Sequence, residues 1–190
     1  MKVRHLLSVV SCLALPLAAQ AAPEAFSIDP NHTFPSFSYS HLGYSTQTSR
    51  FDRTSGKIVL DRAAKTGSAD IQIDMKSVST GSTLFNEHIQ GEDYFNTAKH
   101  PFATFKSTNA YFEGDKPVAL DGELTIKGVT RPVRLKVTSF RQMGHPMLKK
   151  DAIGANAVTV VKRSDFDMAK NTPFVGDEVT ISIAIEAVKD

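Results

Sequence analysis

Apolar and polar residues alternate along several segments of this chain, and this period of two constrains its fold more than any other feature. The clearest run covers residues 179–187, where Val, Ile and Ala at odd positions alternate with smaller or polar residues. Residues 69–75 and 133–137 show the same alternation. Because successive side chains of a β-strand point to opposite faces, each run predicts a strand with one apolar and one mostly polar face.

Weaker strand candidates lie between these runs, and glycine-containing turns separate several of them. They cover residues 36–41, 45–51, 56–61, 102–111, 118–126 and 155–162. Roughly eight or nine one-sided strands without a long helical pattern predict an all-β, antiparallel domain that stacks as a sandwich or closes into a barrel. A sandwich fills its interior with side chains, whereas an eight-stranded barrel can keep room for one small ligand. The strand pattern alone does not choose between them.

The alternation stops between residues 75 and 101, where a short helix is expected. Within this segment apolar residues recur four apart, as at Phe85 and Ile89, and Ser82 precedes them as a capping candidate. This spacing gives a helix one apolar side. Such an insertion would suit a lid at the end of a barrel.

The first 21 residues have the pattern of a secretory signal peptide. Lys2 and Arg4 precede an apolar run that ends at Ala19-Gln20-Ala21, which matches a cleavage site. The run is too short to span a bilayer. We therefore expect cleavage after Ala21, export of the chain and one mature domain at residues 22–190. A weaker alternative is lipidation at Cys12, which would leave almost no apolar region ahead of the lipidated residue.

The composition of the expected mature chain excludes several properties. Cleavage of the signal peptide removes the only cysteine of the chain, so no disulfide is expected. The same loss lowers the number of Lys and Arg from 22 to 20, equal to the 20 Asp and Glu. A neutral chain without Trp or a basic run lacks the electrostatic footprint of a nucleic-acid-binding protein.

The sequence contains no spacing typical of a metal site or a catalytic nucleophile. The H-x-H, H-x-x-E-H and C-x-x-C patterns are absent, and so is the G-x-S-x-G elbow. The histidines beyond the signal peptide are dispersed, so each is expected to have a structural role or to lie at the edge of a site. No metal, cofactor or catalytic residue is expected.

Aromatic residues carry the remaining signal. In the stretch IDPNHTFPSFSYSHLG, Phe37, Tyr39 and His41 share one strand face, and three serines share the other. Many other Phe residues occupy similar inward positions near strand ends. A filled aromatic core is the simpler interpretation, and a ligand cavity is the alternative. His32, on the other side of a proline, is expected to pair with Asp29 as a structural anchor.

Short motifs also follow one another in a fixed order along the chain. They are F-S-I-D-P-N-H-T at 26–33, H-L-G at 41–43, I-D at 73–74, E-H-I at 87–89, D-Y-F at 93–95, H-P at 100–101, T-F-K-S at 104–107, G-E-L-T-I-K-G-V-T-R-P-V at 122–133, R-S-D-F at 163–166 and D-E-V at 177–179. In this order they make the chain resemble the polyisoprenoid-binding YceI-like family of bacterial periplasmic proteins. One departure is Asp167, which stands where the family commonly has Gly, so the loop after Phe166 is expected to differ.

The resemblance implies a lipocalin-like, eight-stranded antiparallel barrel with a short helical insertion. Its apolar interior would bind one long-chain lipid, a polyisoprenoid or a quinone-like molecule, for storage or transport in the periplasm. The resemblance also implies a homodimer and no enzymatic reaction, and a neutral chain without an amphipathic membrane helix indicates only transient membrane contact. Two other classes stay open: a structural or stress-response protein with a filled core, and an enzyme acting on a lipid or quinone.

Strand positions and the resemblance together predict which residues contact the lipid. The apolar and aromatic candidates are Phe34, Phe37, Tyr39, Phe51, Phe95, Phe102, Phe105, Ile126 and Phe166. The polar candidates for a head group are His41, His88 and Arg163. Arg163 is the expected partner for a phosphate because a guanidinium presents a fixed fork of donors, with a salt bridge to Asp165 or Asp177 as the alternative.

Overall fold

The computed structural model describes residues 22–190, so the predicted signal peptide at residues 1–21 and its Cys12 lie outside the described residues. The described chain is built mainly from long strands. They are β1 (Glu24–Ile28), β2 (Phe34–His41), β3 (Ser45–Phe51), β4 (Thr54–Asp61), β5 (Thr66–Asp74), β6 (Val78–Ser79), β7 (Phe102–Glu113), β8 (Lys116–Ile126), β9 (Val129–Gly144), β10 (Asp151–Lys162) and β11 (Glu178–Lys189). The helices are α1 (Thr83–Ile89) and two short 3-10 helices, η1 (Met75–Ser77) and η2 (Arg163–Phe166).

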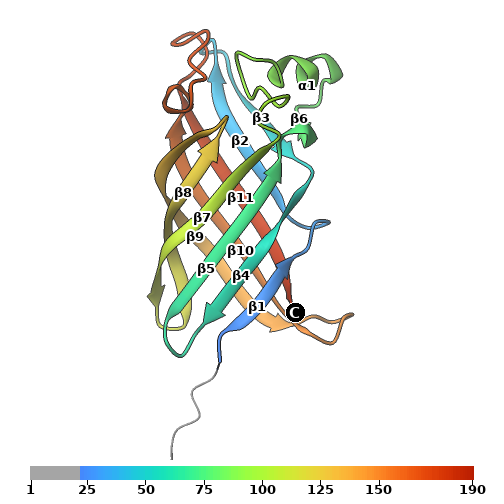
Figure 1. The fold of residues 1–190 in the computed structure, drawn as a ribbon, viewed down its shortest axis with the longest axis vertical. Helices are drawn as coiled ribbons and strands as arrows, with labels where there is room; N and C mark the ends of the chain where they lie inside the picture. The colour runs from blue at the N-terminus through green and yellow to red at the C-terminus, as the bar shows by residue number, and fades with distance from the viewer. Residues whose placement is uncertain (1–21) are drawn as a thin grey trace, which may run out of the picture.

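The strands close into a barrel (Figure 1). Neighbouring strands pair antiparallel in the order β1-β4-β5-β7-β8-β9-β10-β11, and β11 pairs back with β1. The closing register places Phe26 opposite Lys189 and Ile28 opposite Ala187. Closure excludes the sandwich and confirms the expected all-β, eight-stranded antiparallel barrel.

Strands β2 and β3 extend the wall beyond β1 and β4. β2 pairs with the N-terminal half of β11, whereas β1 pairs with its C-terminal end. β3 pairs with β2 and with the short β6. The alternation did not predict β1, because its sequence EAFSI is too short to display a period.

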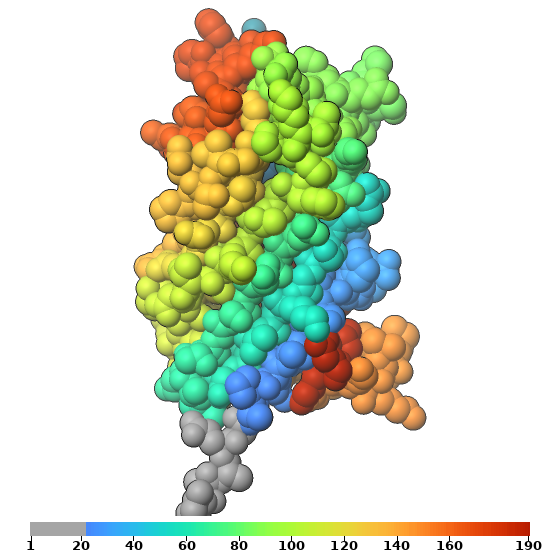
Figure 2. Space-filling model, in the orientation of Figure 1, coloured from blue at the N-terminus to red at the C-terminus, as the bar shows by residue number. Residues whose placement is uncertain are grey.

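The two ends of the barrel carry different connections. At one end lie the turn between β2 and β3, the segment 75–101 with α1, and the segment 163–177 (Figure 1). We call this the α1 end, and the opposite end, where β1 begins and β11 finishes, the β1 end. Figure 2 shows a nearly continuous barrel wall, with these longer connections lying over its α1 end.

The predicted helix in the inserted segment is confirmed. The Ser82 side chain caps α1 by accepting a hydrogen bond from the backbone N–H of Phe85 at 3.4 Å. After the helix the chain turns back, and the backbone N–H of Phe95 donates to the carbonyl of Ile89 at 3.1 Å. No helix within residues 22–190 is long and apolar enough to cross a bilayer.

Apolar side chains pack inside the barrel in two clusters. The cluster at the β1 end contains Phe26, Ile28, Leu60, Ile153 and Ala187, and all five are buried. The larger cluster reaches the α1 end. Its buried members are Phe51, Ala69, Met75, Val78, Ile89, Phe95, Ala103, Phe105, Leu124, Leu135, Phe166 and Met168.

Hydrogen bonds fix the corner between β1 and β2. Asp29 Oδ2 lies 2.7 Å from His32 Nδ1, and Asp29 Oδ1 accepts from the backbone N–H of Asn31 at 2.9 Å. The buried Thr33 hydroxyl bonds to both the carbonyl and the N–H of Glu186, at 3.1 Å each. The predicted pairing of His32 with Asp29 is confirmed. One side-chain nitrogen or oxygen from each of Asp29, His32 and Glu186 could in principle ligate a metal, and these three atoms lie within 4.8 Å of one another. The hydrogen bonds of this corner already account for their proximity.

Asp167 ends η2 in the left-handed conformation, with φ 58° and ψ 39°. Glycine favours this conformation, and Asp is among the residues that tolerate it. The backbone N–H of Asp167 donates to the carbonyl of Ser164, and Lys127 Nζ donates to the Asp167 carbonyl at 2.6 Å. The departure from glycine therefore keeps the backbone turn that a glycine would favour here.

Candidate functional site

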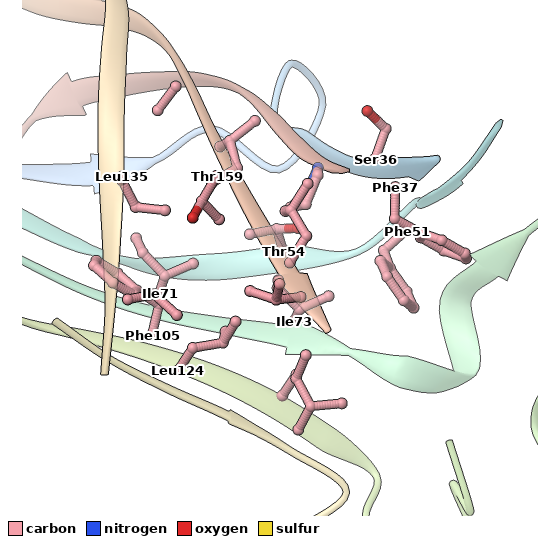
Figure 3. A pocket seen from close by; sticks show the side chains of 18 of the residues that line it. Ser36, Phe37, Phe51, Thr54, Ile71, Ile73, Phe105, Leu124, Leu135 and Thr159 are labelled. Atoms are coloured by element: carbon pink, nitrogen blue, oxygen red, sulfur yellow. The ribbon is translucent and has the colours of Figure 1, made fainter. Parts of the chain in front are cut away.

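A cavity of about 420 Å³ lies inside the barrel. Figure 3 shows Ile71, Ile73, Phe105, Leu124 and Leu135 around it, from β5, β7, β8 and β9. Inward residues such as Ile71 and Ile73 are only partly buried, because they face this space. The volume falls within the range of about 300–1,000 Å³ that is typical of small-molecule sites. The barrel is therefore hollow, and the filled aromatic core was the wrong interpretation.

The wall of the cavity is almost entirely apolar. Every described strand except β1 and β6 contributes to it. Thr54 and Thr159 add two of its few hydroxyl groups (Figure 3). The Thr54 hydroxyl is buried and has no hydrogen-bond partner within the described chain. An apolar wall of this kind suits a hydrocarbon ligand, which needs no hydrogen bonds along its length.

Three phenylalanines meet across the cavity near the α1 end. Phe37 from β2, Phe51 from β3 and Phe95 from the turn after α1 have ring centroids 5.6 to 5.8 Å apart. The rings of Phe37 and Phe95 meet edge to face, and Tyr39 stacks on Phe37 at 6.3 Å. Aromatic pairs of this kind contribute about 0.5–1.5 kcal/mol each beyond burial. The contacts hold the turn after α1 against the barrel wall.

Polar side chains gather at the α1 end of the cavity. The ring of His88 lies 5.0 Å from Tyr94 and 6.0 Å from Phe85. Asn171 Nδ2 donates to the Tyr94 hydroxyl at 3.3 Å. His41 and His88 line the cavity and are also exposed to solvent. We call the ring formed by His41, His88, Tyr94 and Asn171 the mouth.

Tyr39 lies just inside the mouth as a neutral hydrogen-bonding group. Burial raises the pKa of its phenol, the nearby Tyr94 adds to this effect, and Arg163 opposes it. The hydroxyl therefore stays protonated at neutral pH and can donate a hydrogen bond to a ligand.

Arg163 has a different role from either of the two that were predicted. It is 8% exposed, and Nε and Nη2 donate to the carbonyls of Gly176 and Val175 at 2.9 Å each, while Nη1 donates to the carbonyl of Met168. The described residues show no ion pair between Arg163 and Asp177; Asp177 instead accepts from Ser164. Arg163 therefore secures the segment before β11, and the predicted phosphate contact has no geometric support.

The alternative ion pair of Arg163 with Asp165 is likewise absent among the described residues. Three carbonyls already take three of the five N–H groups that a guanidinium offers. Arg163 is also the one Lys or Arg that borders the cavity within residues 22–190. The cavity consequently offers little to attract a charged phosphate.

Ten of the twelve predicted contact residues line the cavity. They are Phe37, Tyr39, His41, Phe51, His88, Phe95, Phe105, Ile126, Arg163 and Phe166. Phe34 and Phe102 do not line it, and their prediction is corrected here. Each lies three residues before an inward Phe, at Phe37 and Phe105, so strand alternation sends it to the outer face. Phe34 lies under the Arg50 guanidinium at 4.6 Å, and Phe102 is 46% exposed.

Several lining residues were not predicted. Tyr94 and Asn171 belong to connections, where no period indicates the direction of a side chain. Ile71 and Ile181 belong to strands whose inward face the alternation had already revealed. The alternation could therefore have identified Ile71 and Ile181 as lining residues, because in a closed barrel an apolar residue of inward parity borders the interior.

A closed antiparallel barrel with one apolar cavity defines a class of small-ligand-binding β-barrels. Within that class the chain belongs to the YceI-like family, since the family model described as the YceI-like domain matches residues 26–187. Protein YceI of Escherichia coli O6:H1 is 34% identical over 175 residues, which cover 90% of each chain. A UPF0312 protein of Pectobacterium atrosepticum is 33% identical over 186 residues, covering 96% of this chain and 95% of the relative. The resemblance seen in the motifs is confirmed.

Solved structures show the same fold. BcnA of Burkholderia cenocepacia matches with a TM-score of 0.71 and 26% identity, over 84% of this chain and 98% of that protein. A polyisoprenoid binding domain from Saccharophagus degradans, implicated in plant cell wall breakdown, matches with a TM-score of 0.67 over 88% of this chain and 99% of the domain. That domain is 20% identical, so the likeness concerns the fold alone.

Proposed function

We propose that the protein binds one long-chain apolar lipid, a polyisoprenoid or a quinone-like molecule, inside its barrel, and that it stores or carries this lipid in the periplasm. The cavity of about 420 Å³ with its apolar wall is the observation that supports this most directly. A named polyisoprenoid binding domain with the same fold supports the choice of lipid class. The periplasmic location rests on the predicted signal peptide at residues 1–21.

The energetics favour a carrier that competes with a membrane. Each CH₂ group removed from water contributes about 0.8 kcal/mol, so a long tail is held strongly in any apolar environment. A bilayer is as apolar as the cavity, and transfer between them is therefore close to neutral. Selection must come from the length and shape of the tail and from the head group. Reversible exchange with a membrane then requires only transient contact.

The mouth favours an uncharged head group. Tyr39 and Asn171 offer uncharged donors and acceptors there, and His41 and His88 add ring nitrogens. Lys127 and Lys170 near the same end pair with Asp167 and Asp93. A quinone or an alcohol matches this set of groups better than a diphosphate does, because a buried anion needs charged partners.

We further propose that the protein catalyses no reaction. The ring of His88 packs against Phe85 and Tyr94, as expected of a residue that contacts a ligand or closes the cavity. Turnover of a lipid or quinone that disappears in His41→Ala or His88→Ala would contradict this proposal.

Mass spectrometry of an organic extract tests the binding. The protein is exported, purified and extracted, and we expect one long-chain lipid at close to one molecule per chain. Phe37→Asp and Phe105→Asp each place a charge in the cavity wall and should remove most of the lipid. Circular dichroism establishes whether each variant is folded. Phe37→Asp should disturb folding less than Phe105→Asp, because Phe37 is only partly buried.

Phe102→Asp provides the matched control. It introduces the same charge on the same strand as Phe105, but on the outer face, where the residue is 46% exposed. Lipid content should equal that of the wild type. Absence of lipid from the wild type, or equal lipid in wild type and Phe37→Asp, would overturn the proposed function.

A further inference from the structure

Four large apolar side chains are exposed around the mouth. Leu42 (49% exposed) and Tyr44 (89% exposed) lie in the turn between β2 and β3. Leu84 (80% exposed) lies in the first turn of α1, and Phe174 (72% exposed) lies before β11. Single exposed apolar residues are common on protein surfaces, whereas a group at one opening is not. We call these four residues the rim patch.

Three of the four rim-patch residues adjoin cavity-lining residues in the chain. Leu42 follows His41, Leu84 precedes Phe85, and Phe174 precedes Val175, and each of these neighbours lines the cavity.

Two of its segments are also joined directly. The backbone N–H of Leu42 donates to the carbonyl of Phe174 at 2.8 Å, and His41 forms a bridge with Val175. The connections that carry the patch lie together at the α1 end of the barrel (Figure 1), next to residues that line the cavity.

The parts of the chain that carry the patch have few charges. Residues 40–47 and 171–176 contain no Lys, Arg, Asp or Glu. α1 carries one Glu and no Lys or Arg. Leu and Phe insert readily into the boundary between head groups and acyl chains, and Tyr prefers the same depth. The partner that fits this surface is apolar beneath a polar layer and needs no particular charge.

We infer that the rim patch docks the α1 end of the barrel on a lipid bilayer, so that the cavity opens directly onto the membrane. The inference rests on the proposed function, because its purpose is to let a lipid tail move between bilayer and cavity without crossing water. The bound state is shallow and reversible, and it depends on apolar contact rather than on anionic lipid.

Flotation with vesicles of phosphatidylcholine, a net-neutral lipid, tests the inference. We expect the mature wild type to float with the vesicles and the variant Leu42→Ser/Tyr44→Ser/Phe174→Ser to bind at least tenfold less. All three residues are exposed, so the fold should survive, as a thermal melt will verify. Raising the salt concentration should leave wild-type binding unchanged within about twofold, since exposed charges contribute little.

The β1 end supplies a matched control. The end of β9 exposes Met143 (66%), and the connection to β10 exposes Met147 (81%) and Leu148 (55%). This hairpin lies at the opposite end of the barrel from α1 (Figures 1 and 2). Met143→Ser/Met147→Ser/Leu148→Ser removes a similar apolar area and should leave vesicle binding unchanged. Loss of binding in this control, or retention in the rim variant, would overturn the inference.

Two further results would also overturn it: wild-type binding that requires anionic lipid and disappears with salt, and a rim variant that alters only the oligomeric mass in light scattering. Lipid content of the same samples, read by mass spectrometry, separates this inference from the proposed function. A rim variant that retains cavity lipid but no longer binds vesicles supports docking. A wild type that floats yet contains no cavity lipid overturns the proposed function while leaving the docking surface established.

Discussion

Thr54 places a hydroxyl in the cavity wall where the described chain offers no partner, although the residue is only 4% exposed. An unsatisfied buried polar group costs about 1–3 kcal/mol. We therefore expect Thr54→Val to raise the free energy of unfolding of the lipid-free protein by about 1 kcal/mol, measured by urea denaturation.

Thr33 is the matched control for that substitution. Its hydroxyl is fully buried but bonds to both the carbonyl and the N–H of Glu186. Thr33→Val should lower the free energy of unfolding by about 1–3 kcal/mol, because the N–H of Glu186 loses its hydroxyl acceptor, whereas the carbonyl of Glu186 still accepts from the N–H of Asp29 at 2.9 Å. If both valines destabilise the protein alike, Thr54 has a partner after all.

His32 and Asp29 shift each other's pKa in opposite directions. The hydrogen bond to Asp29, and then the charge of that carboxylate, raise the pKa of His32 above 6.5. The hydrogen bond from His32, and then that from the backbone of Asn31, lower the pKa of Asp29 below 3.8, against a smaller effect of burial.

This pairing predicts a pH dependence with a definite sign. A raised folded-state pKa means that the His32 contribution is complete below its unfolded value of about 6.5 and is lost as pH rises through the folded value. The Asp29 contribution is present above about 3.8 and is lost as pH falls through the lowered value. Titration by NMR should give His32 a pKa above 6.5, returning toward 6.5 in Asp29→Asn. An unchanged pKa in that variant would contradict the pairing.

Gly122 on β8 leaves no room for a side chain against β7. A Cβ there would lie 2.6 Å from the carbonyl oxygen of Lys106 and from two ring carbons of Phe105. Gly122→Ala must therefore move the Phe105 ring and part of β7. We expect a loss of about 1–3 kcal/mol in the free energy of unfolding and a lower lipid content.

Gly154 on β10 shows what a strand glycine does without this crowding. The nearest heavy atom to a Cβ there is 3.9 Å away, in ordinary contact. Gly154→Ala should change the free energy of unfolding by less than about 0.5 kcal/mol and leave the lipid content unchanged. Equal effects at both glycines would show that the approach of β8 to Phe105 is not what limits substitution.

The whole barrel should respond to the occupancy of its cavity. A ligand that binds only the folded state at 100 times its Kd adds about 2.7 kcal/mol, which corresponds to a rise of roughly 5–10 °C in Tm for a domain of this size. Protein stripped of lipid by extraction and refolding should melt lower by that amount, measured by calorimetry, and recover on reloading. The Phe37→Asp variant should show no such difference. The homodimer and the periplasmic location stay predictions at this scale.

Prediction from the sequence succeeded where the signal was local. The alternation at residues 179–187 became the inward and outward faces of β11, and Ser82 capped the expected helix. It failed at Phe34, which was assigned an inward position although its odd separation from Phe37 places it on the outer face. It also failed at Arg163, whose carbonyl partners belong to a connection that no strand period describes.

The sequence by itself determined most of the strands and the faces that they turn inward, the short helix and the family. These follow from backbone geometry that repeats every two residues in a strand, and from motifs that need no partner to be recognised. Only the tertiary structure decided that the sheet closes, through pairs such as Phe26 with Lys189, and that the closed barrel stays hollow. It also decided that Arg163 binds three backbone carbonyls. Closure and the cavity depend on the pairing of residues far apart in the chain, and no local pattern carries that information.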